Sequence, residues 1–80
     1  MILSPSIDSL QRAQRQLGER IQALREKKGF SQKQLSKECG IGLTKLKLLE
    51  AGETETCLFT VITLADKLGT SVEHLLREIE

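Results

Sequence analysis

The residue types most typical of metal or thiol chemistry, Cys and His, occur in this sequence as Cys39, Cys57 and His74. Because His74 is the only histidine, no pair of imidazoles can form, and the two cysteines lie eighteen residues apart without a CxxC motif. A structural zinc site needs several closely spaced Cys or His ligands. We therefore expect no metal, no cofactor and no enzymatic activity, and we interpret His74 as a surface residue.

The two thiols nevertheless differ in their expected surroundings. Cys39 falls on the apolar face of a predicted helix, where a small buried thiol packs well. Cys57 falls at the expected start of another helix, where a thiol pKa can be lowered, although Glu53 and Glu55 nearby oppose a thiolate. A redox-sensing thiol at Cys57 is thus an alternative to a chemically silent one.

The composition limits the chain to one small domain with an aliphatic core. It has 80 residues, 39% of them hydrophobic, with two Phe and no Trp or Tyr. A core of this size contributes roughly 5 kcal/mol or less of net stability, so a second copy would help. Residues 1–3 are too short for the apolar region of a signal peptide, and Pro5 follows. No apolar run approaches membrane length, so we expect a cytoplasmic protein with reduced thiols and no membrane partner.

Charge is unevenly distributed although the net charge is only +1. Residues 18–47 carry eight Lys and Arg against three Glu, whereas residues 48–80 carry two against seven Asp and Glu. A basic block in a small domain is typical of a surface that faces phosphates. The alternative is an ordinary solvated helix surface with uneven charges.

We expect the basic block to coincide with the segment 31–52, which predicts two short helices, at about 32–39 and 43–51. Ser31 can cap the first, and Gln34 stands three residues later, as in a reciprocal capping box. Gly40 suits a left-handed turn between the helices. Two helices crossed at a tight glycine turn form a helix-turn-helix, which presents the second helix outward.

At 100° per residue, the second of these helices has two distinct sides. Leu46, Leu49 and Glu50 share the side that we expect to face the protein. The outward side is expected to carry Leu43, Thr44, Lys47 and Leu48. Gly42 is a tolerable cap at the start of this helix, and Gly52 ends it.

The N-terminal region allows two interpretations. Apolar residues at helical spacing are compatible with one long helix over about 5–28, with Ser4 as its cap and Pro5 at its first position. The alternative is a loose arm over 1–16 followed by a helix that starts near Leu17 and Gly18. In both cases the helix-turn-helix domain spans 17–80, and residues 1–16 form an arm or a helix extension.

Two further helices are expected after a polar, acidic loop at 53–56. Thr56 or Cys57 should cap the first, and Thr70 or Ser71 the second, with Glu73 completing a capping box if Thr70 is the cap. The apolar face of the first is expected to contain Leu58, Ile62, Ala65 and Leu68, with Val61 and Leu64 alongside. That of the second contains Val72, Leu75, Leu76 and Ile79. No segment alternates with period two, so the fold class is all-α with five helices.

The region 17–76 resembles the phage-repressor-like (XRE, Cro or lambda-repressor-like) family of helix-turn-helix DNA-binding proteins. The matching segments are LGERIQALREKKGFSQKQLS, CGI, LLEAG and LxxVITLADKLGTSVEHLL. The resemblance implies a five-helix DNA-binding domain whose second and third helices form the helix-turn-helix. It also implies an ion pair between Arg25 and Glu50, which we expect to fix the third helix.

By the same resemblance, the third helix meets base edges and phosphates in the major groove of a palindromic operator, and a homodimer binds as a repressor. The residues placed on double-stranded DNA are Gln32, Lys33, Leu43, Thr44, Lys45, Lys47 and Leu48. Gln32 matches a position that usually holds a phosphate. We expect the dimer interface at Leu76 and Ile79, with the N-terminal arm as second choice.

This sequence departs from the family pattern in two places. Leu43 and Leu48 stand where the family usually has polar residues, and leucine cannot make the hydrogen bonds that distinguish bases. Glu53 and Glu55 occupy a loop that is often basic, and they would repel phosphate if the loop faced DNA. Two exposed leucines are also typical of a protein-binding face. The alternative function is therefore a helix-turn-helix domain repurposed for protein contacts, such as an antitoxin or assembly partner, with weak or no DNA binding.

Overall fold

The computed structural model describes residues 7–77, and the side chains from residue 9 on. This part of the chain consists of helices and contains no strand. The helices are α1 (Ile7–Lys28), α2 (Gln32–Cys39), α3 (Leu43–Ala51), α4 (Leu58–Lys67) and α5 (Val72–Leu76). The all-α prediction is confirmed, and α2 and α3 begin and end at the predicted residues.

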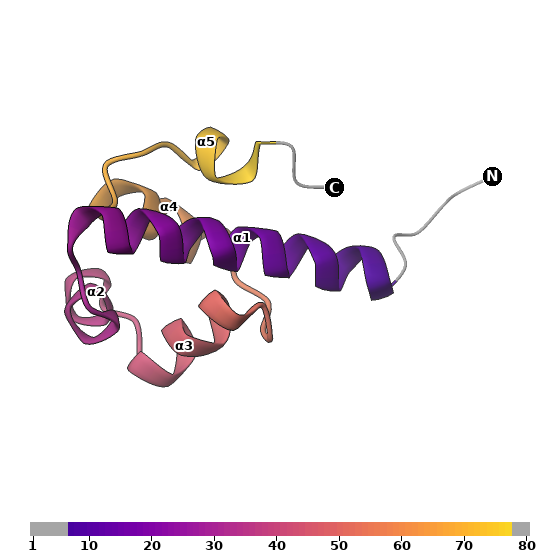
Figure 1. Ribbon diagram of the computed structural model, residues 1–80, viewed down its shortest axis with the longest axis horizontal. Helices are drawn as coiled ribbons and strands as arrows, with labels where there is room; N and C mark the ends of the chain where they lie inside the picture. The colour runs from indigo at the N-terminus through magenta and orange to yellow at the C-terminus, as the bar shows by residue number, and fades with distance from the viewer. Residues whose placement is uncertain (1–6, 78–80) are drawn as a thin grey trace.

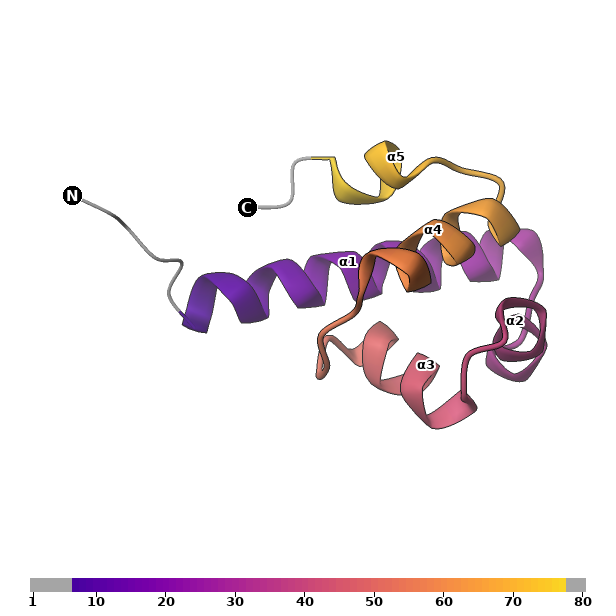
Figure 2. The ribbon, with the colours of Figure 1, turned by 180° about the vertical axis from the view of Figure 1, so that it is seen from behind.

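The long helix α1 runs through the whole molecule, with the shorter helices arranged around it (Figure 1). In both views α2 and α3 lie on one side of α1 and α5 on the other, with α4 between α3 and α5 (Figure 2). α1 contacts α3 and α5, whereas α4 contacts α2 and α5. The helix-turn-helix and the C-terminal helix are therefore separated by α1.

The core is aliphatic, as the composition predicts. Among the described residues, five leucines are less than 2% exposed, and Ile21 is completely buried. The buried hydrophobic residues are Leu17, Ile21, Leu35, Leu46, Leu49, Val61, Leu64, Ala65, Leu68 and Leu75. Every helix contributes at least one of them. Fully burying one such side chain stabilises the fold by about 1.5–3 kcal/mol, so even the short α5 is held through Leu75.

α1 passes through Gly18 without a break, so the alternative of a helix that starts near Leu17 and Gly18 is wrong. Gly18 is buried, and a Cβ built there would lie 2.3 Å from the carbonyl oxygen of Leu49 and 2.6 Å from that of Glu50. The glycine therefore lets the backbone of α3 approach α1 closely, rather than weakening the helix. The predicted start at Ser4 and Pro5 lies outside the described residues.

The caps around the helix-turn-helix form as predicted. The Ser31 hydroxyl accepts from the Gln34 N–H at 3.0 Å, and the Gln34 side chain accepts from the Ser31 N–H at 2.8 Å. Gly40 has φ 66°, a left-handed conformation that side chains resist. Its N–H donates to the Lys37 carbonyl at 3.3 Å, which ends α2.

The predicted apolar face of α4 is confirmed at Ala65 and Leu68 but is wrong at Leu58 and Ile62. Leu58 is 63% and Ile62 44% exposed, and the buried stripe runs through Val61 and Leu64 to Leu68. Both stripes have helical spacing, and contacts with α2 and α5 select the second one. Phe59, 79% exposed, lies beside the exposed stripe.

The cap of α5 also differs from one of the two alternatives. Ser71 is the cap, and its hydroxyl accepts from the His74 N–H at 3.0 Å. Thr70 is therefore one residue too early, and the capping box with Glu73 does not form. Leu76 ends the helix and is 41% exposed, while Ile79 lies outside the described residues.

Candidate nucleic-acid interface

The orientation of α3 is fixed by one buried side. Leu46, Leu49 and Glu50 are 0%, 3% and 6% exposed, so this side packs against the rest of the protein. Thr44 and Lys47 lie on the opposite side and are exposed, as is Lys45. α3 therefore presents one hydroxyl and two ammonium groups to the surroundings, which are donors that can reach base edges or phosphates.

A buried ion pair holds α3 against α1. The Arg25 guanidinium donates from Nε to Glu50 Oε2 at 2.7 Å and from Nη2 to Oε1 at 3.1 Å. Such a two-point fork fixes angle as well as distance. Arg25 Nη1 also donates to the Phe30 carbonyl at 2.8 Å, so the pair reaches the turn before α2. The pair implied by the family resemblance is thus present, with an additional backbone partner that the sequence pattern did not indicate.

Gln32 belongs to the same network through its side chain. Its Nε2 donates to Glu50 Oε1 at 3.0 Å, so the amide is directed into the protein rather than toward a ligand. What Gln32 can offer to a phosphate is its backbone N–H, which lies in the first turn of α2 and has no acceptor within the helix. Lys33, the next residue, is exposed.

The two leucines of the outward side are less exposed than the sequence suggested. Leu43 and Leu48 are both half-buried and do not belong to the exposed large hydrophobic residues of the described chain. The expectation of two exposed leucines on α3 is therefore wrong. The part of each side chain that remains exposed can contact an apolar group such as a thymine methyl.

The acidic loop lies beside α3. The Lys45 ammonium donates to the Glu55 carbonyl at 3.3 Å, and the Glu53 N–H donates to the Leu48 carbonyl at 2.9 Å. Both glutamates are exposed. This places negative charge at one edge of the outward surface of α3, where it opposes the attraction that the lysines exert on a phosphate backbone.

The basic block of the sequence is divided between two faces. Arg20 donates to the carbonyls of His74 and Leu75 in α5, and Lys27 and Lys28 line a hollow against the α4–α5 turn. The expectation that the whole block coincides with the helix-turn-helix is thus wrong. The exposed basic residues on α2 and α3 are Lys33, Lys37, Lys45 and Lys47.

The cysteines do not form a site with other residues. Burial raises the pKa of Cys39, which packs against the core. Cys57 is the exposed cap residue of α4, and a hydrogen bond between its Sγ and the Thr60 hydroxyl, at 3.3 Å, lowers its pKa. Across residues 7–77 no three His, Cys, Asp or Glu side chains are grouped so that they could hold a metal ion. Within the same range no helix has the length and apolar character needed to cross a membrane.

The helices α2 and α3 meet at a glycine with a left-handed backbone conformation, and α3 packs against α1 on one side while its other side is exposed. This arrangement defines the helix-turn-helix class. A family model described as a helix-turn-helix domain matches residues 16–78. The chain therefore belongs to the helix-turn-helix domain family. No curated protein matches the chain.

Several solved structures share the fold. A chain of the SinR protein/SinI protein complex is 28% identical with a TM-score of 0.75, over 78% of this chain and 61% of that one. The restriction-modification controller protein C.AhdI from Aeromonas hydrophila is 27% identical with a TM-score of 0.75, over 78% of this chain and 94% of that one. The clp gene regulator ClgR from Corynebacterium glutamicum is 25% identical with a TM-score of 0.77, over 80% of this chain and 68% of that one.

These similarities confirm the resemblance to phage-repressor-like regulators and the lambda-repressor-like fold. The chain has the family and the fold of DNA-binding regulators rather than of an enzyme. It spans about three fifths of the matched chain in the SinR protein/SinI protein complex.

Proposed function

We propose that this chain is a small, dimeric transcriptional regulator of the repressor type that acts in the cytoplasm and reads a palindromic DNA operator with α3 in the major groove. The single observation that supports this most strongly is the two-sided structure of α3. One side is buried and held by the Arg25–Glu50 fork, while Thr44 and Lys47 point outward. A helix fixed in this way can enter a groove without rearrangement.

The expected contacts divide into two kinds. Thr44 and Lys47 are placed to meet base edges, because Thr can contact a thymine methyl or donate a hydrogen bond and Lys can donate to guanine. Lys33, Lys45 and the N–H of Gln32 are placed to hold phosphates. The exposed edges of Leu43 and Leu48 would contribute apolar contacts and favour A·T pairs.

A dimer is needed because one recognition helix covers too few base pairs for useful specificity. Leu76 was expected at the interface together with Ile79, but Leu76 lines a hollow with Leu10 and Leu17 of α1, so its own chain already covers part of it. A larger exposed apolar stripe lies on α4. We therefore place the main contact between copies on the stripe of Leu58, Phe59 and Ile62, and keep Leu76 and Ile79 as the alternative interface.

The charges around the α4 stripe favour a second copy as its partner. Residues 56–65 contain no Asp, Glu, Lys or Arg, although 29% of the chain is charged. A face that meets an identical face places like side chains near each other, so an uncharged surface avoids repulsion. Exposed apolar patches of this kind mark protein contact sites.

The second candidate function is a helix-turn-helix domain that binds proteins and has little or no affinity for DNA, as in an antitoxin or assembly partner. Two observations favour it: the exposed stripe on α4, and Glu53 and Glu55 beside α3. It predicts that a random-sequence duplex is not bound even at low salt.

Selection of bound sequences from random duplexes separates the two candidates. The regulator is expected to enrich a palindrome, and affinity for that duplex should fall steeply with salt. Each phosphate contact contributes about 0.9 to the slope of log affinity against log salt. Lys47→Ala should weaken binding of the enriched duplex, and Lys33→Ala, at a proposed phosphate contact, should also reduce the slope. Lys27→Ala, which removes the same charge from the other side of α1, should change neither. Failure to enrich any sequence would rule out the proposed regulator.

A further inference from the structure

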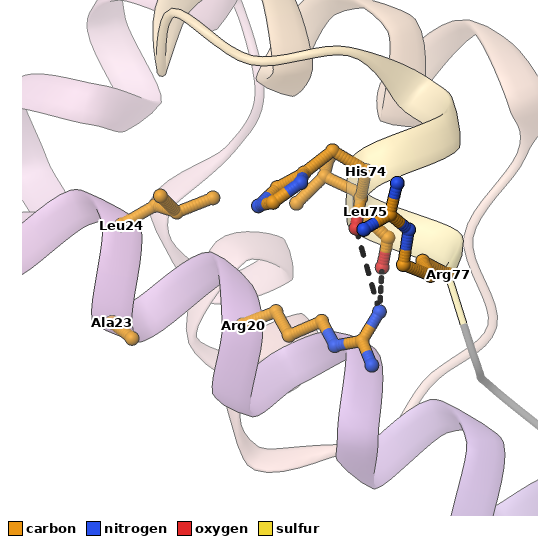
Figure 3. A pocket seen from close by; sticks show the side chains of 6 residues that line it. All are labelled: Arg20, Ala23, Leu24, His74, Leu75 and Arg77. Carbon is orange, nitrogen blue, oxygen red and sulfur yellow. Dashed lines mark hydrogen bonds between the residues drawn. The ribbon is translucent and has the colours of Figure 1, made fainter.

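Helices α1 and α5 enclose a basic groove on the side of α1 opposite to α3. A hollow of about 240 Å³ is lined by Arg20, Ala23, Leu24, His74, Leu75 and Arg77 (Figure 3). A second hollow of about 430 Å³ adjoins it, because Leu24 and His74 line both. We call the two together the α1–α5 groove.

The walls of the groove are cationic. Lys27 and Lys28 line the second hollow, and Arg20 and Arg77 the first, whereas no Asp or Glu of the described part of the chain lines either one. Lys27, Lys28 and Arg77 are exposed, and none of them forms a salt bridge within residues 7–77. The nearest acidic residue along α5 is Glu73, which is exposed and does not line the groove.

The floor of the groove is apolar and held in place. Ala23, Leu24, Leu68 and Leu75 line it, and the last two are buried in the core. Arg20 Nη1 donates to the Leu75 carbonyl at 3.0 Å and to the His74 carbonyl at 3.4 Å, which caps the C-terminal end of α5 and ties it to α1 (Figure 3). The groove therefore does not depend on a ligand for its shape.

We propose that the α1–α5 groove binds an acidic segment of a partner protein, with an apolar side chain of that segment over Leu24 and carboxylates against Lys27, Lys28 and Arg77. Charge complementarity selects an anionic occupant, since among residues 7–77 the rim carries cations and no carboxylate lines it. The apolar floor selects a peptide over a nucleic acid, because a phosphate backbone offers no apolar group to cover it. Because α1 separates the groove from α3, such a partner can bind while α3 lies on DNA (Figure 1).

Fluorescence anisotropy with a labelled peptide of alternating glutamate and leucine tests the proposal on the full chain. Two control peptides replace every glutamate by glutamine or every leucine by alanine. The double variant Lys27→Glu/Lys28→Glu is expected to weaken binding of the first peptide by about tenfold or more. The matched double variant Arg12→Glu/Arg15→Glu makes the same change in charge on exposed positions of α1 outside the groove, and should alter affinity by less than about twofold.

A third variant tests the floor. Ala23 is exposed and lines the hollow, so Ala23→Gln fills space without removing a charge and should weaken the leucine peptide more than the alanine peptide. Equal losses in the two double variants, or no binding of the peptide by the unchanged chain, would overturn the proposal. So would equal affinity for the leucine and alanine peptides, which would identify a site for any polyanion.

Two further outcomes would assign the groove to another occupant and thereby also overturn the proposal. If Lys27→Glu/Lys28→Glu weakens binding of a random duplex as strongly as Lys45→Glu/Lys47→Glu does, the groove binds nucleic acid. If Glu78→Gln/Glu80→Gln strengthens peptide binding by more than about threefold, the chain's own C-terminal residues compete for the groove. Neither result bears on whether α3 reads DNA, so the two proposals can fail separately.

Discussion

Among single residues, Arg25 and Glu50 matter most for the geometry of the site. Their hydrogen-bonded ion pair connects α1 with α3, and Arg25 also binds the turn before α2. Glu50→Gln is expected to lower the free energy of unfolding by about 3 kcal/mol, since it leaves the buried guanidinium of Arg25 without its counter-charge. Urea denaturation followed by circular dichroism measures this. A loss below about 1 kcal/mol would mean that the pair behaves like a surface salt bridge.

The double variant Arg25→Met/Glu50→Leu is the control for that experiment. Replacing both buried charges by apolar side chains removes the stranded charge, so it should be more stable than Glu50→Gln alone. If the double variant is the less stable of the two, the fork contributes net stability and not only orientation.

Cys57 gives a second prediction at this scale. The hydrogen bond to the Thr60 side chain is the largest cause of its lowered pKa. At neutral pH the thiolate fraction of Cys57 is therefore higher than that of an ordinary cysteine. Alkylation by iodoacetamide should therefore be faster at Cys57 than at Cys39, whose pKa is raised by burial. Thr60→Val should shift the pH–rate midpoint of Cys57 upward. An unchanged midpoint in that variant would exclude the Thr60 hydroxyl as the cause.

Between elements, α3 approaches α1 closely at Gly18. An exposed helical Gly→Ala change usually stabilises by about 1 kcal/mol through helix propensity. Here the new Cβ would lie 2.3 Å from the Leu49 carbonyl oxygen, so Gly18→Ala is expected to destabilise by about 2 kcal/mol or more and to displace α3. Thermal unfolding gives the sign, and a rise in the unfolding temperature would contradict the packing described.

Gly42 is the matched glycine for this test. It caps α3, has φ −60°, and a Cβ there would meet nothing within 4 Å. It makes no side-chain cap hydrogen bond, so Gly42→Ser should add one and stabilise the protein by about 0.3 kcal/mol. Opposite signs for the two glycines would show that the loss at Gly18 comes from its close packing and not from replacing a glycine with a larger residue.

The sequence predicted the bounds of a helix well where capping and helix-ending residues are clear. Ser31, Gly40 and Gly52 each have a local physical role that does not depend on the rest of the fold, and the bounds of α2 and α3 follow from them. α4 carries two adjacent apolar stripes, and periodicity alone cannot decide which one a neighbouring helix covers. Leu58 and Ile62 were therefore assigned to the core although they are exposed.

The candidate site was predictable to a similar degree. The inward side of α3 follows from helical geometry, whereas the partners of Gln32 and Lys45 arise from segments distant in the sequence, Glu50 and the acidic loop. The basic block illustrates the same limit. Helical spacing does not say which face of α1 the cations of Lys27 and Lys28 occupy, since that depends on where α5 packs.

For the whole molecule, the proposed dimer makes stability depend on concentration. If two copies pack through the α4 stripe, the unfolding temperature should rise by about 4 °C for each tenfold rise in protein concentration. Phe59→Ser should abolish that dependence, while Gln22→Ser, an exposed change on α1, should keep it. Scanning calorimetry over a concentration series measures both. Loss of the dependence in Leu76→Ser but not in Phe59→Ser would move the interface to α5.

The most direct test of the account is to map a bound duplex onto the chain by amide chemical shifts in nuclear magnetic resonance. The duplex recovered by selection should shift the amides of Thr44, Lys45 and Lys47, together with those of Gln32 and Lys33 in the first turn of α2. The chemical shifts of the amides along α5, and of those at Lys27 and Lys28 at the end of α1, should not change. Shifts concentrated on α4 or in the α1–α5 groove, with α3 unperturbed, would contradict the claim that the outward side of α3 reads DNA.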